Sequence, residues 1–326
     1  MDMQEIVALS VKHNVSDLHL CNDGTVRWRR RGSLEPAPFT GPVPQTLLHQ
    51  WLSQAAQRQW QTENQCDFAV QMEDGARLRA SVFHHAEGIT LVLRLLPERS
   101  PQLSELGVPP AISELLNEES GLILVTGATG SGKSTTLAAM VNHLNHQRDG
   151  HILTLEDPVE FVHHSERCLI HQREVGVHCA SFPAALRVAL RQDPDVILLG
   201  ELRDTETIRL ALTAAETGHL VLSTLHTRGA AQAIERLVDV FPAGEKEQVR
   251  SQLAGSLNAV LAQKLLPDKQ GGRVALYELL VNTPAVGSLI REGKTHQLPG
   301  VMQTGQQVGM LTFTQSYQQR QAAGRL

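Results

Sequence analysis

Glycines and a single lysine stand out in residues 127–134, which read Gly127-Ala128-Thr129-Gly130-Ser131-Gly132-Lys133-Ser134. The stretch follows the pattern G-x-x-x-x-G-K-S, whose backbone amides wrap around phosphate groups. The apolar run Leu122–Val125 comes just before it, and behind it apolar residues recur at helical spacing from Leu137 to Leu144. A strand, a phosphate-binding loop and a helix are therefore predicted in series, which is typical of an α/β nucleotide-binding fold.

The residue types in this loop suit a nucleotide with a metal ion. Glycines at 127, 130 and 132 let backbone N–H groups approach phosphates without a side-chain clash. The helix behind the loop points its positive end at the same anion. Lys133 is placed to reach the β- and γ-phosphates, and the Ser134 hydroxyl is placed to ligate Mg²⁺. We therefore expect ATP and Mg²⁺ as cofactors.

Carboxylates follow two of the predicted strands in this half of the chain. The apolar run Val196–Gly200 leads into Glu201, which could hold Mg²⁺ through water or polarise an attacking water. The run Ile152–Leu155 leads into Glu156-Asp157-Pro158-Val159-Glu160. Three carboxylates within five residues repel one another unless a cation compensates. The alternative is an ordinary solvated loop after a strand.

Two histidines flank another predicted strand, Leu220–Leu222. His219 precedes this strand and His226 follows it, and either could donate to a phosphate or to a carboxylate at a subunit interface. A satisfied core or surface histidine is the alternative for each. The chain has 15 histidines, and the adjacent pairs at 84–85 and 163–164 do not have metal-ligand spacing. We expect most of them on the surface.

The first hundred residues have a different pattern. Helices are expected near residues 1–13 and 46–59, strands at 17–20 and 25–31, a proline-rich loop at 35–44, and a hairpin of strands at 77–82 and 89–95. The polar, proline-bounded segment Pro97–Pro101 suggests a domain boundary, with a small α+β domain at 1–100 and the α/β domain at 101–326. Near the end of the chain, apolar residues from Val249 to Leu261 predict one long helix.

Composition narrows the class of protein. The chain has 326 residues, a formal net charge of −5 and 4% aromatic residues, which argues against a protein that binds nucleic acid through a basic surface or base stacking. No apolar run approaches the roughly 18–20 residues that cross a bilayer, and the start lacks the pattern of a signal peptide. The four cysteines form no C-x-x-C pair. We expect a cytoplasmic protein with reduced thiols.

Five motifs in order resemble those of the type IV pilus retraction ATPase (PilT) family, within the type II/IV secretion ATPases. They are the segment Val15–Leu20, the Walker A loop Gly127–Thr135, the aspartate box Leu153–Phe161, the Walker B segment Arg191–Glu201 and the histidine box Thr217–Thr227. The resemblance implies a PAS-like N-terminal domain joined to a RecA-like P-loop ATPase core. It also implies a homohexameric ring motor in the cytoplasm, held at the inner membrane only through a pilus or secretion platform protein.

The resemblance also implies a role for each motif. Glu201 would be the catalytic carboxylate and would hold Mg²⁺ through water, and Glu160 and Glu156 would organise Mg²⁺ and water, in an order that the sequence leaves open. His219 and His226 would couple the nucleotide state to subunit contacts. The nucleotide-binding residues would be Gly127, Ala128, Thr129, Gly130, Ser131, Gly132, Lys133, Ser134 and Thr135, with Arg79 and Arg94 of the N-terminal domain.

The sequence departs from the family pattern at three places. Ala285–Ser288 replaces the first half of a signature of retraction ATPases, and Thr314 stands where an acid is usual. The segment Arg27–Arg31 is unusually basic. It is either a solvated strand edge or a docking patch for an acidic partner. Three alternatives to retraction follow. They are a pilus-assembly or type II secretion ATPase, a nucleic-acid motor, and a scaffold that binds ATP without turnover. The first is disfavoured because the cysteines are scattered rather than grouped as in a four-cysteine zinc insert.

Overall fold

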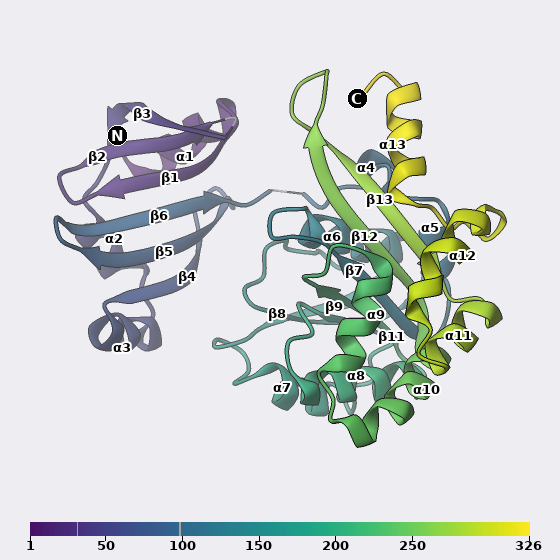
Figure 1. The fold of residues 1–326 in the computed structure, drawn as a ribbon. Coiled ribbons are helices and arrows are strands. Elements are labelled where there is room, and N and C mark those ends of the chain that lie inside the picture. Colours follow the sequence, from purple (N-terminus) through teal and green to yellow (C-terminus); the bar gives the residue numbers. More distant parts are fainter. Residues whose placement is uncertain (31, 98) are drawn as a thin grey trace. The chain divides into compact units, whose positions relative to one another are not determined.

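A computed structural model describes residues 1–30, 32–97 and 99–326, without the side chain of Ala55. Arg31 and Glu98, which belong to the predicted basic run and boundary segment, lie outside the described residues. The chain divides into two compact units, Met1–Arg99 and Ser100–Leu326 (Figure 1). Each unit has its own hydrophobic core and is described separately below.

The first unit is a six-stranded antiparallel sheet with helices on one face. Its strand order is β3-β2-β1-β6-β5-β4. The strands are β1 Val15–Cys21, β2 Thr25–Arg30, β3 Ser33–Thr40, β4 Gln65–Gln71, β5 Arg77–His85 and β6 Gly88–Leu95, and the helices are α1 Met3–Lys12, α2 Pro44–Trp51 and α3 Gln54–Glu63. Alternate apolar residues of the strands, such as Leu18, Leu78 and Leu93, are buried in the core with α1 and α2. The opposite face carries Arg27, Arg29, Arg77, Arg79 and Arg94 of β2, β5 and β6.

Two predictions for this unit were wrong. The proline-rich segment 35–44 was expected to be a loop, but most of it forms the edge strand β3, where Pro36 and Pro38 need no partner for a missing N–H. The single helix expected at 46–59 is two helices. The chain is extended at Leu52, and Ser53 then caps α3 by accepting a hydrogen bond from the backbone N–H of Ala56.

The second unit is built on a seven-stranded sheet in the order β13-β12-β7-β11-β10-β8-β9. All neighbouring pairs are parallel except β12 and β13, which are antiparallel. The strands are β7 Gly121–Thr126, β8 Gly150–Glu156, β9 Cys168–Glu174, β10 Val196–Leu199, β11 Leu220–Leu225, β12 Leu257–Pro267 and β13 Arg273–Val281. The central strands β7, β10 and β11 are buried along their whole length, as expected for strands covered on both faces.

Helices cover both faces of this sheet (Figure 1). One core joins alternate strand residues to α7 Phe182–Ala189, α8 Thr205–Glu216, α9 Ala230–Asp239, α10 Lys246–Ser256, α11 Pro284–Arg291 and α12 Leu298–Thr304. The other joins the remaining strand residues to α4 Leu103–Leu106, α5 Ala111–Leu115 and α6 Lys133–Gln147. The last helix, α13 Phe313–Ala322, contacts β13. The predicted fold class is confirmed: a parallel α/β core preceded by a small α+β unit.

The prediction of one long helix from Val249 to Leu261 was wrong. Helix α10 ends at Ser256, and Leu257 begins β12, which pairs with β7 and β13. The side chains of Leu257, Val260 and Leu261 suit either element, so their spacing could not distinguish a buried strand from a helix. Strands β9 and β13 were also missed. No helix among the described residues has both the length and the apolar character needed to cross a membrane.

Candidate active site

The glycine-rich loop joins the end of β7 to the start of α6. Gly127, Gly130 and Gly132 have φ values of 156°, 76° and 91°, in the region that favours glycine. A Cβ atom on Gly127 would lie 2.5 Å from the Gln263 carbonyl oxygen and 2.5 Å from Ser131 Oγ, so a larger residue cannot fit there. The loop is therefore a backbone cradle at the positive end of a 15-residue helix.

Lys133, the first residue of α6, is held within this loop. Its Nζ donates to the carbonyl oxygens of Gly127 at 2.9 Å and Ala128 at 3.0 Å. Burial lowers the pKa of Lys133, while the nearby charges of Glu201 and Glu160 raise it. The ammonium group is thus partly desolvated, which strengthens its attraction to an anion, while the charges of two carboxylates help keep it protonated.

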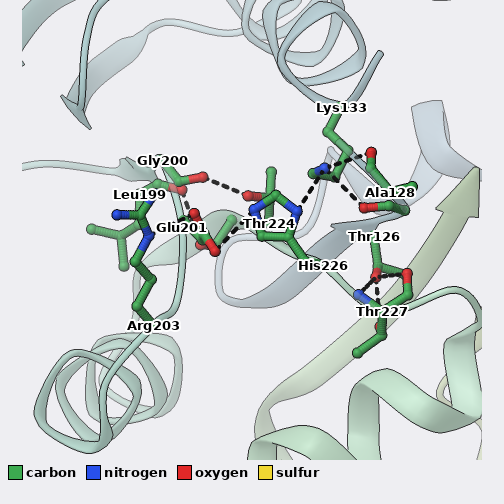
Figure 2. Close-up of polar contacts among 12 residues, drawn as sticks. Thr126, Ala128, Lys133, Leu199, Gly200, Glu201, Arg203, Thr224, His226 and Thr227 are labelled. Carbon is green, nitrogen blue, oxygen red and sulfur yellow. Dashed lines mark hydrogen bonds and ion pairs between the residues drawn. The ribbon is translucent and has the colours of Figure 1, made fainter. Parts of the chain in front are cut away.

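Glu201 follows β10 and reaches the mouth of the same loop. Its Oε2 accepts from Arg203 Nε at 2.8 Å, and its Oε1 lies 3.0 Å from His226 Nε2 (Figure 2). The Glu201 side chain is only 17% exposed, whereas Arg203 is 65% exposed. Thr224 supports this arrangement by donating to the Gly200 carbonyl at 2.6 Å. Both oxygens of the carboxylate therefore have fixed partners.

His226 connects Glu201 to Lys133. The Lys133 ammonium group can only donate, so its 3.4 Å contact makes His226 Nδ1 an acceptor. The Nε2 atom then carries the proton and donates to Glu201. The Nε2–H tautomer satisfies both contacts (Figure 2). The segments that follow β7, β10 and β11 thus bring Lys133, Glu201 and His226 into a chain of contacts. This chain lies at the carboxyl edge of the sheet, where α/β folds bind ligands.

The aspartate box begins within β8 and continues past the end of this strand, at the same edge of the sheet. Its two glutamates have different surroundings. Glu156 Oε1 accepts from Thr154 Oγ1 at 2.7 Å and from Gln172 Nε2 at 3.1 Å. Burial of this half-buried carboxyl raises its pKa, against the lowering effect of the two hydrogen bonds. Glu160 instead acts electrostatically on Lys133. Glu156 is therefore held by side chains of β8 and β9, whereas Glu160 has an electrostatic effect on Lys133.

Strand β9 holds the aspartate-box loop in place. The side chain of Gln172 donates to the Phe161 carbonyl at 2.8 Å and accepts from the His163 N–H at 2.8 Å. Glu174 Oε2 accepts from the Val159 N–H at 3.0 Å. Three backbone groups of the loop are thus bonded to two side chains of one strand.

Strand β12 holds the glycine-rich loop in a similar way. The buried amide of Gln263 donates to the Ser131 carbonyl at 2.6 Å and accepts from Thr136 Oγ1 at 2.8 Å. Thr126, at the end of β7, is in turn bonded to Thr227 through its hydroxyl at 2.7 Å (Figure 2). These contacts fix both ends of the loop against strands from elsewhere in the chain.

Three of the predicted site residues come from other parts of the chain. His219 precedes β11, at the opposite end of this strand from His226, and its Nδ1 lies 3.1 Å from the Ala214 carbonyl oxygen. Arg79 and Arg94 belong to the first unit, where they lie directly opposite each other on β5 and β6. Arg94 Nε donates to Asp17 Oδ1 at 2.8 Å.

Sequence reasoning missed Arg203, Gln172 and Gln263. Arg203 carries a weak signal, since it is a cation two residues after a proposed catalytic carboxylate. Gln263 directly follows the apolar run Ala259–Ala262, which could have identified it as a buried polar contact. Gln172 belongs to a strand that was not predicted, so it carried no signal.

The residues present fit a nucleotide with a divalent cation. Ser131 Oγ is buried in the glycine-rich loop with no hydrogen-bond partner among the described residues, which is a free donor for a phosphate oxygen. Ser134 is exposed at the start of α6. Its hydroxyl, with the carboxylates of Glu201 and Glu160, is the set of hard oxygen donors that Mg²⁺ prefers.

Comparisons with known proteins agree with this geometry. A family model described as "Type II/IV secretion system protein" matches residues 11–323. The Escherichia coli (strain K12) protein "Uncharacterized protein YggR" is 68% identical over 326 residues, which is 100% of both chains. The Pseudomonas aeruginosa (strain PAO1) "Type IV pilus retractation ATPase PilT" is 46% identical over 321 residues, which is 96% of this chain and 92% of the relative.

A solved structure is also similar. It is described as "Crystal Structure of the Pilus Retraction Motor PilT and Bound ADP" and matches with a TM-score of 0.91 and 40% sequence identity. The match covers 100% of this chain and 94% of that chain. The similarity therefore extends over both compact units.

Proposed function

Because the chain belongs to the type II/IV secretion system protein family, we propose that it is an ATP-hydrolysing motor of the pilus-retraction kind. The observation that carries this proposal is the line of contacts from Lys133 through His226 to Glu201 at the mouth of the glycine-rich loop. A phosphate-binding lysine and a candidate catalytic carboxylate are thus held on the same edge of the sheet.

The proposed reaction is attack of water on the γ-phosphate of ATP, which gives ADP and phosphate. Backbone amides of the glycine-rich loop hold the phosphates, and Lys133 exchanges its two carbonyl partners for γ-phosphate oxygens. Glu201 accepts a hydrogen bond from the attacking water and orients it. Ser134 and, through water, Glu201 would hold Mg²⁺, which neutralises charge on the transferred phosphoryl group.

His226 has a specific part in this scheme. When Lys133 turns toward the γ-phosphate, its contact with His226 Nδ1 is lost, and the imidazole is free to move with Glu201. We propose that this makes His226 the residue that passes the nucleotide state to neighbouring parts of the motor. Glu160 and Glu156 of the aspartate box are proposed to support the cation and water. Of these two glutamates, Glu160 is the one whose charge acts on Lys133.

The remaining assignments rest on the family resemblance. Arg79 and Arg94 are proposed to contact the nucleotide, His219 to contribute to subunit contacts, and the two compact units to be the PAS-like and ATPase domains. The assembly is proposed to be a homohexamer in the cytoplasm that works on a pilus or secretion platform protein of the inner membrane.

Phosphate release by the purified protein tests the chemistry. Wild type is expected to hydrolyse ATP, and Lys133→Ala and Glu201→Gln are expected to lose at least about 100-fold in kcat. Glu201→Gln should still bind ATP, since Lys133 and the loop remain. Parental turnover in either variant would contradict the assignment. Stimulation by single-stranded DNA that disappears with salt would favour a nucleic-acid motor instead.

Retraction itself needs a cellular test. Deletion of the gene in a piliated host is expected to leave extended pili that no longer shorten, and the wild-type gene should restore shortening where Glu201→Gln does not. Normal shortening in the deletion strain would point to a different motor role for the same ATPase.

A further inference from the structure

A cavity of about 490 Å³ lies beside β8 and β9. Its lining comes from the two strands, from the segment after β9 and from the residues after α7, and consists of His151, Leu153, Ile170, His171, Gln172, Arg173, His178 and Gln192. Its volume is within the range of small-molecule sites. Apart from Gln172, it shares no residue with the candidate active site described above.

The lining is basic. Arg173 carries a permanent positive charge, three of the lining residues are histidines, and none of the described residues that line the cavity is acidic. The guanidinium of Arg173 contacts only neutral acceptors within the described chain, with Nη1 3.5 Å from Gln192 Oε1 and Nη2 3.3 Å from the His178 carbonyl oxygen. Both contacts are long. The cation is therefore available for a stronger, charged acceptor.

The hydrogen bonds fix which ring nitrogens carry protons in the neutral histidines. His151 Nδ1 lies 3.0 Å from the Asp193 carbonyl oxygen, which can only accept, so His151 Nδ1 is the donor. His151 Nε2 must then accept from His171 Nδ1, 2.9 Å away. His171 Nε2 is therefore left as an acceptor, with no partner among the described residues.

His178 has the opposite arrangement. Its Nδ1 accepts from the backbone N–H of Glu174 at 3.0 Å, so its proton is on Nε2. His178 Nε2 has no partner within the described chain and is free to donate. The cavity thus combines a guanidinium donor, an imidazole donor and an imidazole acceptor.

We propose that this cavity binds the phosphate group of a small anion, with Arg173 and His178 donating to its oxygens and His171 Nε2 accepting from its P–OH group. Monohydrogen phosphate offers both acceptor oxygens and one O–H. Sulfate at neutral pH offers acceptors alone, so the lone pair of His171 disfavours it. The arrangement therefore selects for a protonated oxyanion and not for negative charge in general.

The test is a calorimetric titration of the full-length protein with inorganic phosphate and with sulfate at pH 8, in saturating ADP so that the glycine-rich loop contributes equally throughout. Phosphate is expected to bind and sulfate to bind at least about tenfold more weakly, because one charge-assisted hydrogen bond changes affinity by that factor or more. Arg173→Gln should lower phosphate affinity about tenfold or more. Arg191→Gln, the same change in a nearby arginine that does not line the cavity, should leave it unchanged.

Two further arms complete the design. His171→Phe should reduce phosphate affinity toward that of sulfate while leaving sulfate unchanged, and circular dichroism melting checks that each variant is folded. Glycerol phosphate, whose dianion has no P–OH at pH 8, distinguishes a site for the free phosphate ion from a site for a phosphate ester. Weaker binding than inorganic phosphate identifies a site for the free ion, and equal binding overturns the role of His171. Equal affinities for phosphate and sulfate, or for wild type and Arg173→Gln, overturn the proposal.

Discussion

The Nε2 atom of His226 lies 3.0 Å from Oε1 of Glu201, although the two residues follow different strands. Parallel pairing of β10 with β11 brings the two chain segments side by side. On its other side the imidazole is 3.4 Å from Lys133 Nζ. A single histidine thus contacts both residues that the proposed hydrolysis needs most.

Replacing His226 tests this contact. His226→Phe removes the donor to Glu201, and loss of one hydrogen bond to a charged group costs about 1.5–3 kcal/mol, or about 10–100-fold in kcat. His226→Gln should retain more activity, because its amide can donate to Glu201 and accept from Lys133. Steady-state phosphate release measures both. The matched control is His146→Gln at the exposed end of α6, which should hydrolyse ATP like wild type, and equal losses at the two positions would contradict a local role for His226.

Gln263 is predicted to stabilise the glycine-rich loop. Gln263→Leu leaves the Ser131 carbonyl and the Thr136 hydroxyl without their partners, at about 1–3 kcal/mol for each buried group that stays unpaired. We expect a lower melting temperature and weaker ADP binding, measured by thermal unfolding and calorimetry. Gln252→Leu is the control. Its amide donates to Glu216 on the surface, and its loss should change the unfolding free energy by no more than about 0.5 kcal/mol.

Glu156 is predicted to make stability depend on pH. Burial raises its pKa in the folded protein above that of the unfolded chain, so the fold favours the protonated carboxyl. Its contribution is present below the unfolded pKa and is lost as pH rises through the folded pKa. Glu156→Gln, which stays neutral, should therefore gain stability relative to wild type as pH increases. Melting temperatures at pH 5 and pH 8 measure this, and a difference that shrinks with pH would refute the prediction.

Gly287 is a site for stabilisation within one of the family departures. It lies inside helix α11, and a Cβ atom there would make contacts no closer than 3.4 Å. Gly287→Ala should raise the unfolding free energy by about 0.5–1 kcal/mol. Gly309 is the contrasting control, because its φ is 85° and a Cβ atom would lie 2.4 Å from Ala111 Cβ. Gly309→Ala should destabilise by more than about 1 kcal/mol, and a melt in which both variants shift in the same direction would contradict this account.

Local motifs predict the centre of the second unit well. The glycine pattern requires a strand before it and a helix behind it, and the apolar runs ending at Leu155, Leu199 and Thr224 identify three parallel strands. Because parallel strands end at one edge, spacing alone also indicates that Glu201 and His226 are near the glycine-rich loop. The edges of the sheets were harder to predict. Pro36 and Pro38 obscured a strand that tolerates them, and Leu257 begins a strand within a helix-like pattern.

The contacts that hold the loops could not be predicted from local patterns. Gln263 meets Ser131 across 132 residues of chain, and Gln172 meets Glu156 across 16. The partners of such amides are recognised only once the strand order is known, because the local sequence does not show which loop the amide faces. The different surroundings of Glu156 and Glu160 also could not be seen without this information.

Strand β9 contributes side chains both to the aspartate-box loop and to the cavity, because its side chains alternate. Gln172 and Glu174 hold the aspartate-box loop, whereas His171 and Arg173 supply the polar groups of the basic cavity. In evolutionary terms His171 and Arg173 can vary by substitution independently of Glu174, whereas Gln172, which also lines the cavity, is tied to both the loop and the cavity. An insertion or deletion of a single residue would exchange the sides and disturb both together. Relatives are therefore expected to differ in the residues of this strand but to preserve its length.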